Sequence, residues 1–468
     1  MFELHHLSAQ EQWGWLHSGE ITPLELVEHY LARIEQFNDS LGAFTTVTAD
    51  AARERARTLA PGPEALWGIP LGDKDLVRRA GVRTTFGSRL FENFVPDESD
   101  ELVRVLDDAG AISLGKTNAP EFGFPSYTEN LIGPPARTPY DLALGAGGSS
   151  GGAAVAVAAG LLPVAPGSDG GGSIRIPAAA TGLVGLKPSR GRIPAGSGFG
   201  SLGSLVVPGP IARTVADAAM LFDAMIESGP FPFATAAPSW DEGSYLGAAV
   251  RGEGRFNLGV MTTSPWDDAY EITVSPEATD ALAVALRELD AIGHGIDQFA
   301  LQPSPEYAPA FRTVWMSGAA GLPAEGAQLE LLEPLTRWLV ARGREVSARE
   351  LGSALATLTA FERSVIRQFS RFDAVLTPAM ALTQRPVGWY SSDDPELNFA
   401  QQCQYTPFTS FANVAGLPAI SLPVHETADG LPMGVQLVGR PGGEHVLLAI
   451  GAQLERRLRW QLRHPPQW

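Results

Sequence analysis

The first sixty residues have the pattern of apolar and polar positions that is typical of helices. Ser8 is a suitable N-cap for one helix. Thr22 and Pro23 are the N-cap and first-turn residues expected of a second helix, over TPLELVEHYLARIEQF. A third helix is predicted from about Asp50, over DAARERARTLA. The chain therefore begins with a helical segment.

Short apolar runs then alternate with helical patterns. Residues 67–75 and 111–114 are predicted as strands, the second of them buried, and residues 97–109 as a helix between them. Beyond residue 212 the predicted elements are helices at 214–225, 276–291 and 444–456, a mostly helical stretch at 305–370, and strands at 256–261, 373–376 and 419–424. This alternation is typical of an α/β protein.

Residues 145–205 depart from this pattern because glycine is unusually dense there. GAGGSSGGAAVAVAAG, GSDGGGSIRIP and PAGSGFGSLG follow one another closely. Glycine permits positive φ and close approach of the backbone to other groups. We therefore expect this stretch to form neither ordinary helix nor ordinary strand.

Composition and charge exclude several classes of protein. The net charge of −18 makes binding to nucleic acid or to an anionic membrane unfavourable. A single cysteine excludes a disulfide within the chain and metal sites built from cysteine. The start of the chain, MFELHHLSAQEQW, lacks the charged and apolar parts of a signal peptide. The longest apolar stretch, at 151–167, is too short and too interrupted to span a bilayer, so we expect a cytoplasmic globular protein.

Three short motifs match known expressions without the context that each expression requires. GAISLGKT at 110–117 matches a P-loop, but its middle residues have the pattern of a buried strand. GFGSLG at 198–203 matches a dinucleotide-binding motif, but no predicted strand precedes it and no helix follows. GGSSG at 147–151 matches the nucleophile elbow of α/β-hydrolases, an alternative that needs a later aspartate and histidine. The later histidines, none of them in an informative context, are His294, His425, His445 and His464.

Three other segments place a lysine and two serines in a recurring arrangement. They are GIPLGDKD at 68–75, GGSSGG at 147–152 and GSDGGGSIRIP at 167–177. Lys74 and Ser149 are 75 residues apart, and Ser149 and Ser173 are 24 residues apart. These segments and spacings resemble the amidase signature family, whose serine hydrolases use a Ser–cis-Ser–Lys triad. Further likeness lies in GKTNAPE, YTEN, GLVGLKP, FANVAGLPAISLP and GLPMGVQLVG.

The resemblance implies a role for each of these side chains. Ser173 is then the nucleophile, Ser149 relays its proton to Lys74, and the peptide bond before Ser149 is cis. An oxyanion hole for amide hydrolysis needs converging N–H donors. The candidates for these donors are Gly170, Gly171, Gly172 and Ser173. The family often has isoleucine where Gly170 stands, so we expect a looser loop here.

A lysine base must be neutral, although the pKa of a free lysine is about 10.4. Burial in an apolar environment lowers that pKa. The apolar neighbours at 69–71 and 76–77 favour such burial of Lys74. Asp73 and Asp75 flank Lys74, and alternation along an extended segment would direct both carboxylates away from it.

Other residues are assigned to support or to substrate binding. We predict that Ser150 is a hydrogen-bonding support and that Asp169 pairs with Arg175 to brace the loop. Lys187 is predicted to be structural. The candidate substrate-binding residues are Tyr127, Thr128, Trp315, Trp389 and Phe408.

The resemblance covers about residues 8–460 and implies an α/β amidase-signature fold. This is a single large domain with a central mixed, twisted β-sheet covered by helices on both faces. The chain has no internal repeat and no linker-like stretch. Within the domain, 1–468, we expect a helical segment at 1–62, the core with the triad at 63–230, and the remaining strands and substrate-side helices at 231–468.

The function implied is cleavage of the C–N bond of carboxamides through an acyl-Ser173 intermediate. The same tetrahedral chemistry would serve aryl esters and carbamates (urethanes), and the apolar composition of 305–410 favours an aryl or alkyl substrate. No metal or cofactor is expected. The expected partner is a small-molecule amide or carbamate, and the chain is expected to be a monomer or homodimer. The alternative is the glutamine-hydrolysing component of a tRNA-dependent amidotransferase, although 388–413 looks unlike that component.

Overall fold

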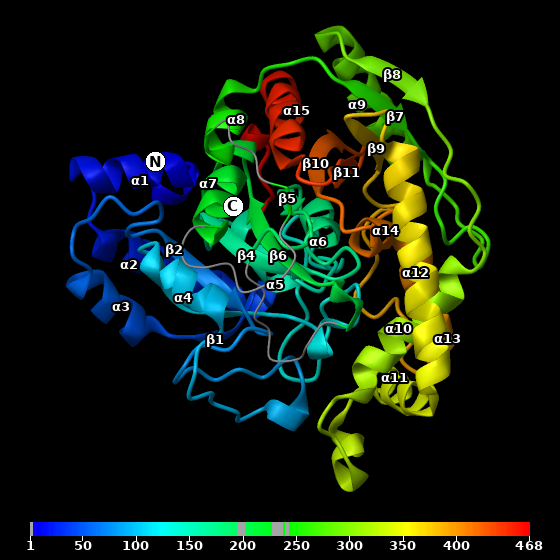
Figure 1. The fold of residues 1–468 in the computed structure, drawn as a ribbon. Helices are drawn as coiled ribbons and strands as arrows, with labels where there is room; N and C mark the ends of the chain where they lie inside the picture. Colours follow the sequence, from blue (N-terminus) through cyan, green and yellow to red (C-terminus); the bar gives the residue numbers. More distant parts are fainter. Residues whose placement is uncertain (1–2, 194–201, 227–236, 239–242) are drawn as a thin grey trace.

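The computed structural model describes residues 3–193, 202–226, 237–238 and 243–468. In Figure 1 the N-terminal helices lie on the left, the strands of the large sheet run from the centre to the upper right, and the long helices of residues 307–405 lie on the right. The GFGSLG motif at 198–203 lies mostly outside the described residues.

The N-terminal helices begin at the predicted capping residues. They are α1 (Ala9–Ser18), α2 (Pro23–Leu41) and α3 (Ala49–Thr58). Ser8 and Thr22 each accept a hydrogen bond from the backbone N–H three residues later, and the glutamate there bonds back, so both helices begin with a capping box.

A small sheet carries the lysine segment. β2 (Pro70–Lys74) runs parallel to β3 (Ile112–Thr117), which pairs on its other side with antiparallel β1 (Phe44–Val47). The predicted helix between β2 and β3 is α4 (Glu101–Asp108), which begins four residues later than expected. The carboxylate of Asp100 binds the backbone N–H and guanidinium of Arg78, which keeps the preceding residues out of the helix.

The large sheet has eight strands in the order β4-β6-β5-β10-β11-β9-β7-β8. The pairs from β4 to β9 are antiparallel, and β9-β7 and β7-β8 are parallel, so the sheet is mixed. The strands are β4 (Val164–Asp169), β5 (Val184–Lys187), β6 (Val207–Ala212), β7 (Asn257–Val260), β8 (Gly295–Gln298), β9 (Ala374–Pro378), β10 (Ala419–Glu426) and β11 (Pro432–Gly439).

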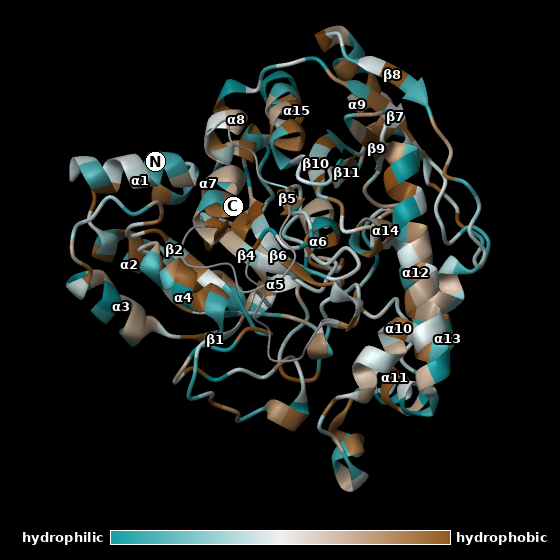
Figure 2. Ribbon diagram, in the orientation of Figure 1, coloured by the Kyte–Doolittle hydropathy of each residue, from teal (hydrophilic) through white to brown (hydrophobic). Residues whose placement is uncertain are grey.

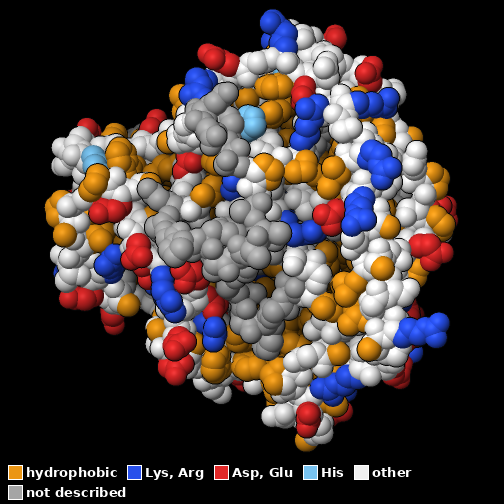
Figure 3. All heavy atoms as spheres, viewed as in Figure 1, with side chains coloured by type: hydrophobic (Ala, Val, Ile, Leu, Met, Phe, Trp, Pro, Cys, Tyr) orange, Lys and Arg blue, Asp and Glu red, His pale blue; other side chains and the backbone are white. Residues whose placement is uncertain are grey.

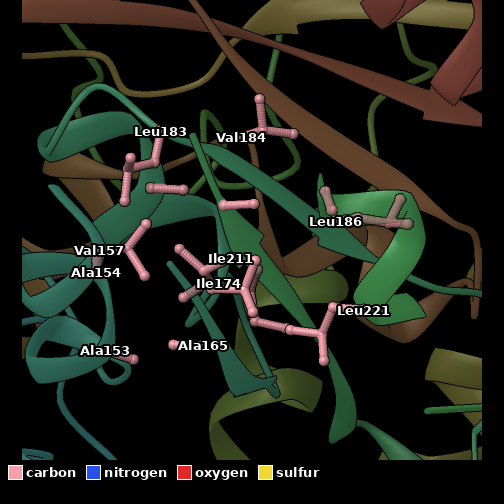
Figure 4. Close-up of a cluster of buried hydrophobic side chains, with 14 of the residues drawn as sticks. Ala153, Ala154, Val157, Ala165, Ile174, Leu183, Val184, Leu186, Ile211 and Leu221 are labelled. Carbon is pink, nitrogen blue, oxygen red and sulfur yellow. The ribbon is translucent and has the colours of Figure 1, made fainter. Parts of the chain in front are cut away.

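Helices cover both faces of this sheet and complete a single domain. On one face lie α7 (Val215–Ile226), α9 (Pro276–Ile292) and α15 (Glu444–Leu458), with α8 (Tyr245–Arg251) packed on α7 and α15. On the other face lie α5 (Gly151–Ala158) and α6 (Arg175–Ala180). Figure 4 shows part of the core, where side chains of α5, such as Val157, lie near Ile174 and near Ile211 of β6.

The glycine-rich stretch contains more regular structure than predicted. The strand β4 and the helices α5 and α6 all lie within 145–205, so the expectation of neither helix nor strand is wrong there. Close approach explains part of the glycine content instead. A Cβ on Gly152 of α5 would lie 2.2 Å from the backbone nitrogen of Asn118. Small residues therefore let this helix pack directly against a neighbouring backbone.

A helical layer forms beside the sheet from residues 305–370, as predicted. It comprises α10 (Tyr307–Ala320), α11 (Pro334–Glu345) and α12 (Ala348–Phe369), followed by α13 (Pro395–Tyr405) and α14 (Ser410–Val414). Figure 2 shows teal and brown segments along α12, as expected of a helix with one face against the protein. The 3₁₀ helices are Leu4–His6, Arg89–Phe91, Glu121–Gly123, Leu202–Ser204, Gly326–Leu331 and Trp460–Leu462.

The surface and helix lengths add two observations. Acidic and basic side chains both occur around the face drawn in Figure 3. Among the described ranges, no helix is long and apolar enough to cross a membrane.

Candidate active site

Lys74 is the last residue of β2 and its side chain is buried. The strand directs its acidic neighbours elsewhere, as predicted. Asp73 binds Arg79 at 2.6 Å, and Asp75 accepts hydrogen bonds from the backbone and hydroxyl of Thr85. Neither carboxylate therefore pairs with the ammonium group of Lys74.

The Lys74 ammonium contacts hydroxyl and carbonyl oxygens instead. Its Nζ lies 2.8 Å from Ser149 Oγ, 3.0 Å from Ser168 Oγ and 3.2 Å from the Ser168 carbonyl oxygen. Burial lowers the pKa of Lys74 to about 7, although the charge of Asp169 acts in the opposite direction. A large share of the amine is therefore neutral at neutral pH.

The loop that carries Ser149 is held by residues from a preceding segment. The Gly148–Ser149 peptide bond is cis, as the resemblance implies. A Cβ on Gly148 would lie 2.6 Å from the carbonyl carbon of Tyr127, so only glycine fits there. Thr128 Oγ1 donates to the Gly147 carbonyl oxygen at 2.9 Å and accepts from the backbone N–H of Gly151.

Ser150 joins the two serine segments, in the supporting position predicted for it. Its backbone N–H donates to the carbonyl oxygen of Ser173 at 3.1 Å. Its hydroxyl accepts from the backbone N–H of Ser168 at 3.3 Å. The segment before Ser173 and the end of β4 are thereby tied to the loop of Ser149.

Ser173 lies in the turn between β4 and α6, which an ion pair braces. Asp169 and Arg175 are both fully buried and their side chains are 2.8 Å apart, so the predicted pair is present. Asp169 also accepts from the backbone N–H groups of Gly172 at 2.7 Å and Ile174 at 3.1 Å. Although burial opposes it, the Arg175 guanidinium holds the pKa of Asp169 well below its usual range.

These bonds decide which N–H groups can face a substrate. The Gly172 N–H is already bound to Asp169, which removes Gly172 from the predicted set of oxyanion donors. In the described part of the chain, the N–H groups of Gly170, Gly171 and Ser173 have no acceptor. Three of the four predicted donors therefore remain available.

Two cavities meet at Ser173. Phe124, Ser173 and Trp315 line both of them. The larger is also lined by Leu76, Val77, Phe86, Leu102, Phe122, Gly123, Ser149, Gly167, Ser168, Gly170, Leu202, Leu205, Val206, Pro208, Val314, Gly318 and Leu322. The smaller is also lined by Pro125, Ser126, Gly171, Ile176, Trp266, Phe311, Phe399, Gln402, Cys403, Thr406 and Ser410. None of these described lining residues is charged.

Of the predicted substrate-binding residues, Trp315 alone lines these cavities. Trp389 packs against Tyr390 and Arg385 and lines neither cavity. Phe408 is fully buried, with its carbonyl oxygen bound by Gln436. Core packing accounts for both side chains.

Tyr127 and Thr128 also line neither cavity. They contact the backbone of the Gly147–Gly151 loop instead. The aromatic lining residues that sequence reasoning missed are Phe86, Phe122, Phe124, Trp266, Phe311 and Phe399. An isolated aromatic residue has no sequence pattern that marks it as a cavity residue. For Phe124 alone, the family-like YTEN segment at 127–130 indicated that the region is near the site.

The other motifs have structural explanations. The middle of the P-loop-like motif lies in β3, as predicted, and its Lys116 is buried with Asp75 at 3.7 Å. The nucleophile-elbow alternative needs a histidine beside Ser149, but no described histidine lines either cavity. His294, for example, binds the Phe256 N–H and Gln453.

Comparison with known proteins agrees with this architecture. The family model described as Amidase matches residues 25–448. The chain belongs to the amidase signature family. It is 36% identical to AmiB2 of Mycobacterium bovis, which is named as an amidase, over 99% of this chain and 98% of the relative. It is also 34% identical to a component of the Glutamyl-tRNA(Gln) amidotransferase of Roseiflexus sp., over 99% and 98% of the two chains.

Solved structures of the family have the same fold. A 6-aminohexanoate cyclic dimer hydrolase complexed with substrate superposes with a TM-score of 0.91 at 30% identity, covering 99% of each chain. A bacterial aryl acylamidase of the amidase signature family superposes with a TM-score of 0.86 at 27% identity, covering 98% and 97%. The family and these neighbours identify the chain as a hydrolase that acts on amide C–N bonds.

Proposed function

We propose that the protein is a self-sufficient amidase in which Ser173 is the nucleophile, Lys74 the base and Ser149 the proton relay. One observation carries this proposal most strongly. A buried lysine with a pKa near 7 lies 2.8 Å from a hydroxyl in the wall of the cavity that Ser173 also lines. A neutral amine beside a hydroxyl can withdraw protons from a second serine through the first.

The reaction divides into two acyl transfers. Ser173 Oγ attacks the amide carbonyl carbon while its proton passes to Ser149 Oγ, whose own proton passes to the neutral amine of Lys74. When the tetrahedral intermediate collapses, the C–N bond breaks and the leaving nitrogen receives a proton from Ser149, which Lys74 replenishes. Water then repeats the sequence on the acyl-Ser173 ester and releases the carboxylic acid.

Free backbone donors would stabilise the charge that develops during these steps. The Gly171 and Ser173 N–H groups have no acceptor among the described residues, and Gly170 offers a third donor. Removing one such donor typically slows a reaction by about 10²–10³. Ser149 Oγ lies 2.8 Å from Lys74 Nζ and no hydrogen bond joins the Ser149 and Ser173 hydroxyls, a catalytic contact of the kind that often tightens only in the complex with substrate.

The cavities favour a neutral, apolar substrate. A zwitterionic amino acid such as glutamine needs a cation for its carboxylate and an anion for its ammonium group, and burying either charge unpaired is costly. The described lining residues offer neither. This supports a small-molecule amidase over the alternative of an amidotransferase component, in spite of the similarity to one.

Esters and carbamates are further candidate substrates for the same groups. An aryl ester or aryl carbamate presents a carbonyl to Ser173 and releases an alcohol or an amine through the same tetrahedral chemistry. We propose amides as the main substrates, because amide hydrolysis is the activity of the family, and expect ester cleavage to depend on Ser173 as well.

The test is hydrolysis by the purified chain alone. Wild type should release 4-nitroaniline from 4-nitroacetanilide, and Ser173→Ala should lose this activity while keeping its circular dichroism spectrum and melting temperature. Glutamine should not be hydrolysed, with or without tRNA. Glutaminase activity that rises with an amidotransferase partner and tRNA would overturn the proposal in favour of the amidotransferase component.

A further inference from the structure

The two cavities at Ser173 differ in which of the other catalytic residues line them. Ser149 lines the larger cavity but not the smaller, whereas Gly171 lines the smaller but not the larger. Gly123 lies beside the relay serine on the same side, since a Cβ there would be 3.3 Å from Ser149 Oγ. The proton source for the leaving group therefore faces only the larger cavity.

We infer that the larger cavity holds the amine portion of the substrate and the smaller cavity holds the acyl portion. This deepens the proposed function and rests on it. The leaving nitrogen must lie next to Ser149 to receive its proton, and whatever is bonded to that nitrogen extends into the larger cavity. The acyl chain then lies on the Gly171 side. The substrate class is a neutral secondary amide with a bulky apolar amine and a short acyl group.

The sizes of the cavities agree with this assignment. The larger has a volume of about 140 Å³ and the smaller about 70 Å³. An apolar protein cavity of about 150 Å³ accommodates a benzene molecule. The larger cavity therefore has room for one aromatic ring. Its lining residues, among them Leu76 and Leu322, are mainly aliphatic and aromatic. Ammonia, the leaving group of a primary amide, would leave this apolar volume unfilled.

An aromatic pair forms part of the wall of both cavities. Trp315 and Phe124 line both cavities and meet edge to face, with ring centroids 5.8 Å apart. Phe311 stacks on Trp315 at 5.5 Å from the side of the smaller cavity. A substrate with its amide bond at Ser173 would extend one substituent into each cavity, past this pair.

Gly170 enlarges the amine side in this chain. A Cβ at this position would lie 2.9 Å from Val206 Cγ2 and 3.5 Å from Trp315, which are both walls of the larger cavity. A branched side chain there would occupy space that the glycine leaves open. Gly170 therefore leaves volume for the amine substituent.

Gly318 provides a variant that fills the larger cavity without disturbing the catalytic groups. It lies in α10, lines the larger cavity, and has no atom within 4 Å of the position that a Cβ would take. Leucine is also a better helix former than glycine, so Gly318→Leu should fold. The matched variant is Cys403→Met, which lengthens a side chain that lines only the smaller cavity.

The experiment measures kcat/KM for these two variants on two series of amides. One series varies the amine, from N-methylacetamide to 4-nitroacetanilide, and the other varies the acyl group of the anilide from acetyl to hexanoyl. Gly318→Leu should lower kcat/KM for the anilide by about tenfold or more relative to N-methylacetamide, because a hydrophobic pocket discriminates by this amount per group. Cys403→Met should lower kcat/KM most for the longer acyl groups and leave the preference among amines unchanged.

The outcomes separate this inference from the proposed function. If Gly318→Leu changes the preference for acyl length and Cys403→Met the preference for amine size, the assignment of the cavities is reversed and the inference is wrong. If folded wild type hydrolyses no amide, the proposed function itself fails. The wild-type series gives a result that does not depend on how either variant folds. Its kcat/KM should rise with the apolar area of the amine and fall as the acyl chain lengthens, and the opposite trends would overturn the inference.

Discussion

At the scale of single residues, the contact of a buried lysine matters more than its burial. Burial lowers the pKa of Lys74 and of Lys187 to about 7, so the pKa alone does not distinguish them. Lys187 Nζ donates to the Pro188 carbonyl oxygen, whereas Lys74 Nζ lies beside the Ser149 hydroxyl. Only Lys74 can therefore pass a proton toward the cavity.

The pH dependence of acylation tests the role of Lys74. The neutral amine is the reactive form, so kcat/KM should be low at pH 6, rise through pH 7 and level off above pH 8. Lys74→Met should reduce kcat/KM by about 10²–10⁴. Lys187→Met is the control and should keep the rising profile. A flat wild-type profile from pH 6 to 9, with chemistry limiting the rate, would contradict the assignment.

The ion pair beneath the nucleophile should dominate local stability. Asp169→Asn leaves the fully buried Arg175 without its counter-ion. Breaking a buried pair on one side costs about 3–5 kcal/mol. Urea unfolding of the variant should show a loss of this size in the free energy of unfolding, and a loss below about 1 kcal/mol would mean that Asn413 and Gln436 hold Arg175 adequately by themselves.

At the scale of elements, local signals predicted the helices best. Ser8 and Thr22 fixed the starts of α1 and α2, because an N-cap acts through the adjacent turn. The start of α4 was missed because Asp100 binds Arg78, a contact across 22 residues. The regular elements within the glycine-rich stretch were missed for a similar reason. The backbone that Gly152 approaches belongs to Asn118, which is distant in the sequence.

The turn from β4 to α6 allows a sharp comparison of adjacent glycines. Gly172 has a φ of +135°, and a Cβ there would lie 2.5 Å from Thr409 Oγ1. At Gly171 the nearest atom would be 3.8 Å away. Gly172→Ala should therefore lower both the melting temperature and kcat/KM by clear margins.

Gly171→Ala is the matched control for the fold. Its free energy of unfolding should stay within about 0.5 kcal/mol of wild type, as for other unstrained substitutions. Thermal and urea unfolding of the two variants side by side would check this. Equal destabilisation by both substitutions would contradict the account of this turn.

At the scale of the whole molecule, the site lies where the two sheets meet. β2 of the small sheet contributes Lys74, and β4 of the large sheet leads to Ser173, with the loop of Ser149 between them. The mixed sheet and the roles of the triad segments could be predicted through the resemblance to the amidase signature family, which the motifs and their spacing revealed. The cavity walls could not, because Phe122, Trp266 and Phe399 converge only in three dimensions.

The pH dependence of global stability follows from a buried carboxyl far from the triad. Burial raises the pKa of Glu455 to about 8. Its Oε2 accepts from the Val215 N–H, and its Oε1 has no partner among the described residues. The folded protein thus holds a proton that the unfolded chain releases above its ordinary pKa of 4.5. The free energy of unfolding should therefore fall as the pH rises from about 5 to 8.

Glu455→Gln should remove this part of the decline. Between pH 5 and pH 9, urea unfolding should show wild type losing about 2 kcal/mol or more relative to the variant. Glu253→Gln, at an exposed position, is the control and should follow the wild-type curve. Parallel curves for wild type and Glu455→Gln would show that this carboxyl is not the group responsible.

The proposed mechanism requires Ser173 to carry the acyl group during turnover. Rapid acid quenching after mixing with 4-nitrophenyl acetate or 4-nitroacetanilide, followed by peptide mass spectrometry, locates the acyl group directly. We expect one acetyl group on the peptide that contains Ser173, and none in Ser173→Ala. Acetylation of a different residue with Ser173 unmodified, while product still forms, would contradict it.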